Sequence, residues 1–175
     1  MPQQLKWFQR TFDFSFPAGL FPSILERLRG TPARLEDLAR LYPLRIFTMR
    51  ADSGWTMQEH AGHLYDLDEL HEQRLDDYLA GKAALRPADL ANTKTVKANH
   101  NAASLDAVLR NFRSARQHFV YRLSALDDRI LERTAVHPRL NQPMRLVDMA
   151  YFVAEHDDHH IARMTALARM FLRED

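Results

Sequence analysis

Two short stretches of the chain hold five of its nine histidines, in a spacing suited to metal binding. His60 and His63 lie in the first stretch, and His156, His159 and His160 lie in the second. On a helix, the side chains of residues four apart such as His156 and His160 lie one turn from each other, with about 5–6 Å between their Cβ atoms. Two such imidazoles can share one metal ion. A third from a facing helix would complete a three-histidine site with open positions, as in catalytic zinc centres.

The composition narrows the chemistry further. None of the 175 residues is cysteine, which excludes thiol nucleophiles, zinc fingers, iron–sulfur clusters and disulfides, and fits a reducing compartment. Any metal site must therefore be built from histidines and carboxylates. The charges nearly cancel, with 24 Lys and Arg against 23 Asp and Glu, so we expect no nucleic-acid partner. No apolar run approaches the roughly 20 residues of a membrane span, and no leader is evident, so we expect a cytoplasmic protein without a membrane partner.

Helical periodicity supplies the elements that must position the histidines. Thr56 and Glu59 have the spacing of a capping box, which predicts a long helix that ends near Leu79. Alternating apolar and polar residues over Phe12–Phe16 predict an extended aromatic N-terminal arm, packed on the bundle or on a second subunit. The other expected helices are a short one from Pro22 to a stop at Gly30, a second over Ala33–Tyr42, one from Ser104 to about Leu126, and one over Leu146–Leu172.

These elements predict an all-α fold, an up-and-down four-helix bundle that forms a single domain over residues 1–175. We expect no β-hairpin beyond the arm, and we expect residues 85–103 to form a long loop with about one turn of helix. A chain of this length buries a sufficient core without a structural metal. A metal in this protein is therefore expected to serve function, between facing helices of the bundle.

Helical wheels place both groups of histidines on apolar faces. On the helix that begins at Thr56, the residues His60, His63 and His71 all project toward the core, and the wheel does not settle which of them is a ligand. On the last helix the two histidines four residues apart point inward, whereas His159 lies at the edge. A lone inward histidine is more often a hydrogen-bonded core residue. A buried pair is costly to desolvate without a shared partner, which favours a metal.

Residues near these histidines could orient or cover the site. Asp157 borders the apolar face and could orient a ligand histidine through a hydrogen bond. His137 precedes a proline, in a loop that could lie over the site, although a plain turn is the simpler interpretation. We interpret His100 and His118 as surface or loop residues. Three further acidic residues are interpreted as solvated charges: Asp66, Glu69 and Asp158.

Two motifs together resemble a known family. The segment 55–64, WTMQEHAGHL, and the segment 156–161, HDDHHI, resemble the DinB family of DinB/YfiT-like metalloenzymes. The resemblance extends over most of the chain, although its specificity comes from these two motifs. It implies a four-helix bundle, commonly dimeric, with a divalent metal, usually zinc or nickel, held by His63, His156 and His160. The wheel alone slightly favours His60, which is the alternative ligand.

One position departs from the family pattern. The family often has glutamine three residues after the last ligand, and this chain has Arg163 there. An arginine at the rim of the site would favour an anionic substrate. We prefer the simpler interpretation, a surface residue whose aliphatic stem packs on its neighbours.

The resemblance implies a metal-dependent enzyme that acts on a small molecule, either a thiol-dependent S-transferase or a hydrolase. Such a metal lowers the pKa of a bound thiol or water. Because the chain has no cysteine, the thiol would arrive as a low-molecular-weight cosubstrate such as bacillithiol, mycothiol or glutathione. The alternative is a stress-linked binding or interaction bundle whose metal is structural or absent. The aromatic arm and the family habit predict a homodimer, and the sequence assigns no catalytic residue.

Overall fold

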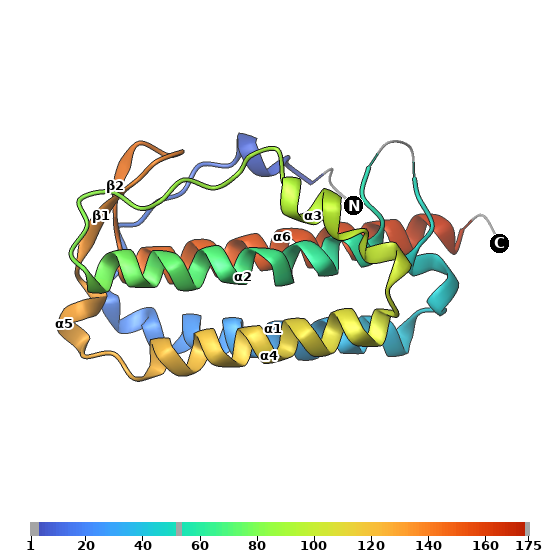
Figure 1. Ribbon diagram of the computed structural model, residues 1–175, viewed down its shortest axis with the longest axis horizontal. Helices are drawn as coiled ribbons and strands as arrows, with labels where there is room; N and C mark the ends of the chain where they lie inside the picture. The colour runs from blue at the N-terminus through green and yellow to red at the C-terminus, as the bar shows by residue number, and fades with distance from the viewer. Residues whose placement is uncertain (1–3, 52–53, 174–175) are drawn as a thin grey trace.

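The four-helix bundle is confirmed in the computed structural model, which describes residues 4–51 and 54–173. The long helices are α1 (Phe21–Leu41), α2 (Met57–Leu79), α4 (Leu105–Ser124) and α6 (Leu146–Phe171), as labelled in Figure 1. α1 packs on α4 and α6, and α2 packs on the same two helices, so consecutive long helices are not always neighbours. α1 and α6 run in one direction and α2 and α4 in the other (Figure 1). α2 and α4 are parallel because residues 80–104, which join them, return along the length of the bundle.

Local signals explain the helix boundaries. The Thr56 side chain accepts a hydrogen bond from the amide of Glu59, and the Glu59 side chain accepts one from the amide of Thr56. This is the predicted capping box, and α2 begins directly after it. Ser104 caps α4 through the amide of Ala107, and α6 begins at the predicted residue, Leu146. Three of the four long helices therefore start where the sequence indicated.

The predicted break after Gly30 is wrong, because α1 is continuous and contains Pro32 in its interior. A proline there removes one helical hydrogen bond. The hydroxyl of Thr31 donates to the Arg27 carbonyl and lies 2.8 Å from a carboxylate oxygen of Asp157 on α6, which fixes the helix beside the proline. Tertiary contacts thus outweigh the local breaker.

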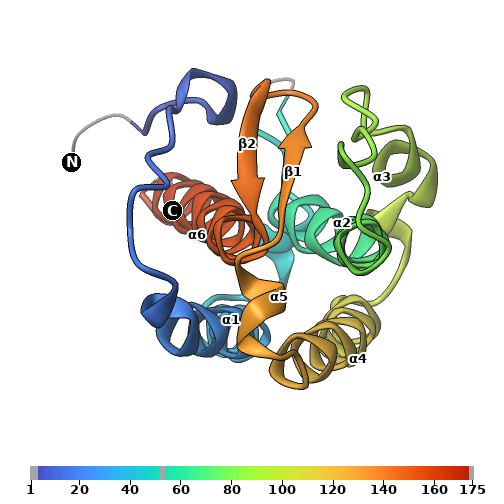
Figure 2. The same ribbon diagram turned by 90° about the vertical axis from the view of Figure 1, so that its left-hand side faces the viewer.

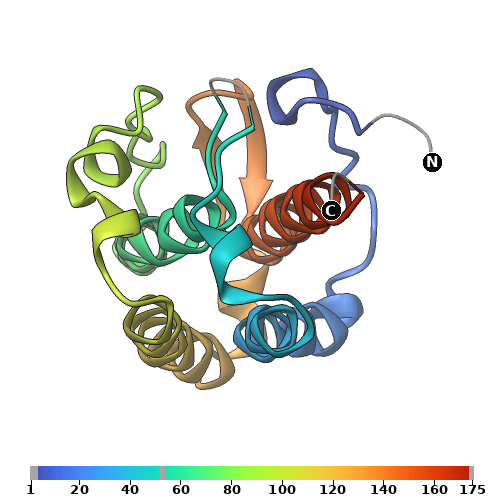
Figure 3. The same cartoon turned by 90° about the vertical axis from the view of Figure 1, so that its right-hand side faces the viewer.

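Three segments cover the outer face of the α2–α6 pair, on the side away from α1 and α4 (Figures 2 and 3). They are the N-terminal arm, the segment between α2 and α4, and a two-stranded hairpin before α6. Their short elements are η1 (Trp7–Gln9), α3 (Thr93–Ala98), η4 (His100–Ala102), β1 (Thr134–His137) and β2 (Gln142–Arg145). Of the other short elements, η2 (Ala18–Leu20) leads into α1, η3 (Leu44–Phe47) lies between α1 and α2, and α5 (Asp128–Leu131) lies between α4 and the hairpin. The strands β1 and β2 form this hairpin and pair antiparallel, with Thr134 opposite Arg145.

The expectation of no hairpin beyond the arm is therefore wrong. Pro143 lacks an amide donor and is tolerated only at a sheet edge, which disguises the strand in the sequence. Asn141 adopts a left-handed conformation, with φ of 49°, in the turn. Val136 exchanges backbone hydrogen bonds with residues 83 and 85, so the hairpin is also anchored to the segment that follows α2.

The predicted aromatic arm is confirmed and packs on its own bundle. The ring of Trp7 lies 5.1 Å from that of Phe152, and Phe12 contacts the same ring. Arg10 forms a salt bridge with Glu155 on α6. The homodimer stays a prediction, which sedimentation at the mass of a single chain would contradict. Across residues 4–51 and 54–173, no helix is long and apolar enough to cross a membrane.

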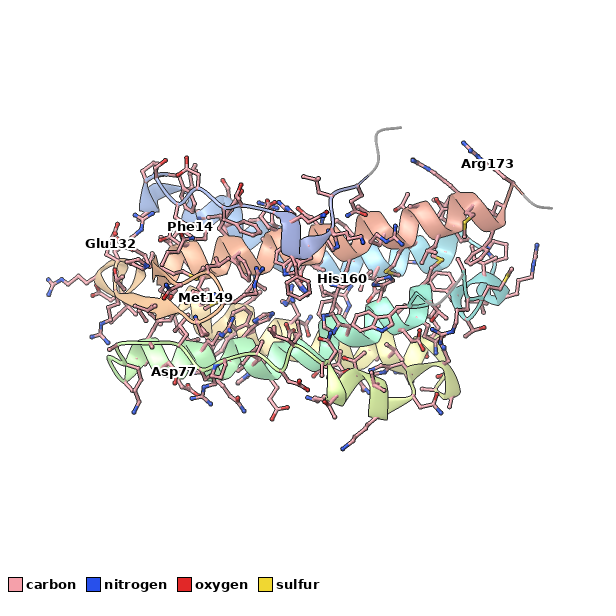
Figure 4. The ribbon with its side chains drawn as sticks, turned by 90° about the horizontal axis from the view of Figure 1, so that it is seen from above. Phe14, Asp77, Glu132, Met149, His160 and Arg173 are labelled. Atoms are coloured by element: carbon pink, nitrogen blue, oxygen red, sulfur yellow. The ribbon has the colours of Figure 1, made fainter. Side chains whose placement is uncertain are left out.

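The interior of the bundle is apolar at both ends and polar in the middle. One apolar cluster includes Leu28, Leu75, Phe119 and Val153, and the other includes Leu35, Leu64, Phe112 and Met164. Between the clusters each long helix contributes at least one buried polar residue, including Thr31, His71, Arg116 and His156. Figure 4 shows His160 in this middle section of the long axis. The polar layer is where the candidate site lies.

Candidate metal centre

The structure brings together three buried histidines, His63 from α2 and His156 and His160 from α6. One ring nitrogen from each lies within 4.8 Å of those of the other two. The Nε2 atoms of His156 and His160 are 3.1 Å apart. Nitrogens bound to one zinc ion at about 2.0–2.1 Å lie about 3.3 Å from one another in tetrahedral geometry. The three side chains can therefore meet one ion after small adjustments.

A glycine on α2 allows the neighbouring segment to support His63. The ring of His100 lies directly on Gly62, where a Cβ atom would collide with it. Its Nε2 atom lies 2.8 Å from the Asp66 carboxylate. This contact holds the 93–102 segment on α2, and the Thr95 hydroxyl there lies 3.1 Å from Nδ1 of His63. The interpretations of His100 as a surface residue and of Asp66 as a solvated charge are wrong, because both are buried.

Burial keeps these imidazoles neutral. Desolvation lowers the pKa of His63 from 6.5 to about 4 and that of His60 to about 3. It also holds the pKa values of His156 and His160 well below the ordinary value, and the neighbouring histidines add to the effect. Metal ligation requires the neutral form of histidine. All three candidate ligands are therefore in the form that can bind at neutral pH.

The ring nitrogens outside the three-nitrogen group differ in their partners. Nδ1 of His160 lies 2.8 Å from Nδ1 of His60, so His60 is placed to orient His160. Nδ1 of His156 is buried without a hydrogen-bond partner. The ring of Trp7 stands edge-on to the His156 ring, with 4.9 Å between the ring centroids. The wheel's slight preference for His60 as a ligand is not matched by the grouping, which contains His63 instead.

The remaining predicted residues take different places. The carboxylate of Asp157 contacts Arg116 and Thr31, so the expectation that it orients a ligand histidine is wrong. Arg163 is exposed, as the surface interpretation requires, and so is His118. His159 is half-buried, with Nδ1 3.1 Å from the Gln4 amide, and His137 is buried at the end of β1 and not in a plain turn. Two of the acidic residues form ion pairs. Asp158 pairs with Arg27 and Arg34, and Glu69 pairs with Lys94.

A cavity of about 330 Å³ opens beside the three histidines, between the α2–α6 pair and the segments that cover it. Its apolar lining includes Trp7, Leu67, Leu70 and Phe152, and its polar lining includes His71, Arg74, His137 and Arg139. The sequence reasoning did not assign the two arginines to the site. A signal existed for Arg74, which falls on the apolar face of the α2 wheel, where a charged residue is unusual.

A buried ion-pair cluster fixes the two helices that carry the histidines. Arg116 of α4 is 1% exposed and donates to Asp68 of α2, at 2.8 Å, and to Asp157 of α6. Burial raises the pKa of Asp68 to about 6, although Arg116 acts in the opposite direction. Since Asp157 directly follows His156, this cluster sets the distance between the ligand-bearing faces of α2 and α6.

The comparisons with known proteins agree with this architecture. The model of the DinB superfamily matches residues 27–164. YfiT from Bacillus subtilis, described as a probable metal-dependent hydrolase with an unusual four-helix bundle topology, is 21% identical in sequence. The similarity covers 93% of each chain with a TM-score of 0.79, which at this identity shows a shared fold. No match is found among curated proteins.

Proposed function

Because the chain belongs to the DinB superfamily, we propose that it is a metal-dependent hydrolase that holds one divalent ion with His63, His156 and His160. The observation that carries this proposal is the convergence of three buried, neutral imidazoles beside a cavity. The fold shared with YfiT, itself described as a probable metal-dependent hydrolase, supports it.

The donor set fits a divalent transition metal. Three imidazoles suit zinc and nickel, as well as copper and iron, and we propose zinc or nickel from the family resemblance. Three protein ligands leave room for a further ligand from solvent or substrate. When bound, such an ion supplies Lewis-acid chemistry and lowers the pKa of a water molecule enough to give a nucleophile near neutral pH.

The chain's own residues orient the ligands and limit access of water. The Thr95 hydroxyl and Nδ1 of His60 hold Nδ1 of His63 and Nδ1 of His160, which leaves the Nε2 atom of each ring for an ion. The ring of Trp55 lies 4.6 Å from that of His63 and shields it on one side. Two of the three ligands, His63 and His160, are therefore oriented by contacts that exist before any ion binds.

Two histidines outside the ligand group are placed to move protons. His71 lines the cavity, and its Nδ1 atom is buried without a hydrogen-bond partner. His159 also lines the cavity and is half-buried, with a pKa lowered by burial and by nearby arginines. We propose these two as the donors or acceptors for a proton at the reacting group of the substrate.

A panel of small esters and amides, tested with zinc-loaded and nickel-loaded protein, examines this function. We expect turnover that is lost on chelation and in His156→Ala, and retained in the control His118→Ala, which changes an exposed histidine. Turnover that persists in His156→Ala would reject the proposal. Turnover only with an added low-molecular-weight thiol would support the S-transferase instead. Loss of the fold on chelation would support a structural metal.

A further inference from the structure

Two arginines line the cavity, and neither forms a salt bridge with a carboxylate among the residues that the structure describes. Arg74 is 3% exposed. Its Nε atom donates to the Arg86 carbonyl at 3.1 Å, and its Nη1 atom lies 3.3 Å from Nε2 of His137. Both partners are uncharged. A guanidinium this deeply buried ordinarily has an anionic partner, since an unpaired buried charge is costly.

The second arginine approaches from the hairpin turn. Arg139 places its guanidinium carbon 5.7 Å from the ring centroid of Trp7 and 5.5 Å from that of Phe152. Its Nη2 atom is buried and has no hydrogen-bond partner. The aromatic contacts hold the side chain in place, and they leave a donor in the cavity unused.

The nearby carboxylates are already engaged elsewhere. Asp77 pairs with Arg86 through both of its oxygens. Asp89 lines the cavity, but its carboxylate accepts hydrogen bonds from the amides of Ala91 and Thr93. Among residues 4–51 and 54–173, no salt bridge reaches either cavity arginine. The cavity therefore has a surplus of positive charge.

Both arginines remain protonated at neutral pH. Burial lowers the pKa of Arg74 to about 10, and the like charge of Arg139 contributes in the same direction. Burial also lowers the pKa of Arg139. Arg74 contacts His137, which lies two residues before Arg139, and both arginines line the same cavity, so their like charges repel each other. An anion between them would relieve that repulsion.

We propose that the cavity binds a small, elongated carboxylate, with the anion between Arg74 and Arg139 and the apolar part on the wall formed by Leu67, Leu70 and Phe152. The planar guanidinium matches a carboxylate through paired hydrogen bonds. The apolar walls favour a monoanion over a dianion, because desolvation costs more for the higher charge. The two guanidinium groups thus supply both the positive charge and the hydrogen-bond donors of the proposed carboxylate site.

The spacing of His63 and Arg74 along α2 indicates how long a ligand must be to reach both the metal ligands and the arginines. His63 and Arg74 are 11 positions apart on this helix, about three turns or about 16 Å of rise. A substrate that reaches both ends must therefore carry its anion and its reacting group at opposite ends. This placement of the reacting group rests on the proposed hydrolase function, whereas the anion site does not.

Calorimetry with two matched probes tests the site: 4-phenylbutyrate and its neutral analogue 4-phenylbutan-1-ol. We expect the wild type to bind the carboxylate at least about tenfold more tightly than the alcohol, as charge-assisted hydrogen bonds imply. Arg139→Gln should remove this preference, and Arg139→Lys should retain part of it. The control Arg129→Gln, which changes an exposed arginine outside the cavity, should keep the full preference.

Equal binding of the two probes by the wild type would overturn the proposal. So would a preference that survives in Arg139→Gln but disappears in His156→Ala, since that result places the carboxylate at the metal ligands instead. A preference that persists in His156→Ala supports the anion site even if no hydrolysis is found. The failure of the proposed function and the failure of the anion site therefore give different results.

Discussion

Two clusters of buried polar side chains lie in the middle of the bundle, and they differ in how far their hydrogen bonds are satisfied. In the cluster around Arg116, all three guanidinium nitrogens donate to carboxylates of Asp68 and Asp157. In the cluster around the three histidines, the Nε2 atoms of His156 and His160 have each other as partners, and Nδ1 of His156 has none. The first cluster is complete within the chain, and the second is not.

This difference separates structure from function. Buried polar groups in folded proteins are nearly always hydrogen-bonded, and an unsatisfied one costs about 1–3 kcal/mol. The unsatisfied atoms of this chain include Nδ1 of His71, Nδ1 of His156 and Nη2 of Arg139, which all belong to residues that line one cavity. The Arg116 cluster fixes the helices, whereas the cavity residues are arranged for molecules that the chain itself does not supply.

The largest expected effect is on acid stability without metal. Six buried histidines have pKa values lowered by desolvation: His60, His63, His71, His137, His156 and His160. Below pH 6.5 the unfolded chain binds protons that the folded chain does not, so the free energy of unfolding falls as pH falls. Each histidine contributes up to about 1.4 kcal/mol per pH unit. We expect urea denaturation of the chelated protein to show a steep loss between about pH 6.5 and pH 4.

Asp68, in the Arg116 cluster, makes the free energy of unfolding rise as pH falls over part of this range. The raised pKa of Asp68, about 6, means that the folded state gains a proton before the unfolded state does as pH falls. One carboxyl group offsets only one of the six histidines. Stability that is constant from pH 7 to pH 5 would contradict the neutral, buried state of the histidines.

The next largest effect is expected from Arg116→Met. Removing one partner of a buried ion pair leaves uncompensated charge and costs about 3–5 kcal/mol of unfolding free energy. The matched control is Arg113→Met, on the same helix, whose partner Glu36 is partly exposed, and about 0–1 kcal/mol is expected there. Urea denaturation in chelator measures both. Equal losses in the two variants would show that the Arg116 cluster is not the fixed part of the polar layer.

A smaller effect is expected from Gly62→Ala. The added methyl group collides with the ring of His100, and overpacking of this kind costs about 1–3 kcal/mol, which exceeds the gain of about 1 kcal/mol from a helical alanine over most of that range. Gly30→Ala is the control, since nothing lies within 4 Å of its added Cβ, and a helical alanine there should stabilise the protein by about 1 kcal/mol. Thermal unfolding distinguishes them by the sign of the change. If both variants are stabilised, His100 does not lie on α2 as described.

Features that depend on neighbours in the chain could be predicted from the sequence. The capping box at Thr56, the cap at Ser104 and the start of α6 at Leu146 are local signals, and the structure has each of them. Helix periodicity also placed His156 and His160 on an inward face, where both are buried. One part of the candidate site, the histidine pair on α6, was therefore accessible from spacing alone.

Features that join distant parts of the chain could not be predicted in this way. His100 meets Asp66 across 34 positions, and Arg74 meets His137 across 63. Nothing in the local pattern of either residue specifies such a partner. The continuous α1 is a similar case, because the contact that supports the helix beside Pro32 comes from Asp157 on α6. Only the family resemblance separated His63 from His60.

The central claim is that His63, His156 and His160 hold one divalent ion. Elemental analysis after zinc loading and gel filtration tests it in the wild type, His63→Ala and His60→Ala. We expect about one zinc per chain in the wild type and none in His63→Ala. His60→Ala should retain the site with an affinity about 10–100-fold lower, because it loses only the residue that orients His160. A full equivalent of zinc in His63→Ala, or none in the wild type, would contradict the claim.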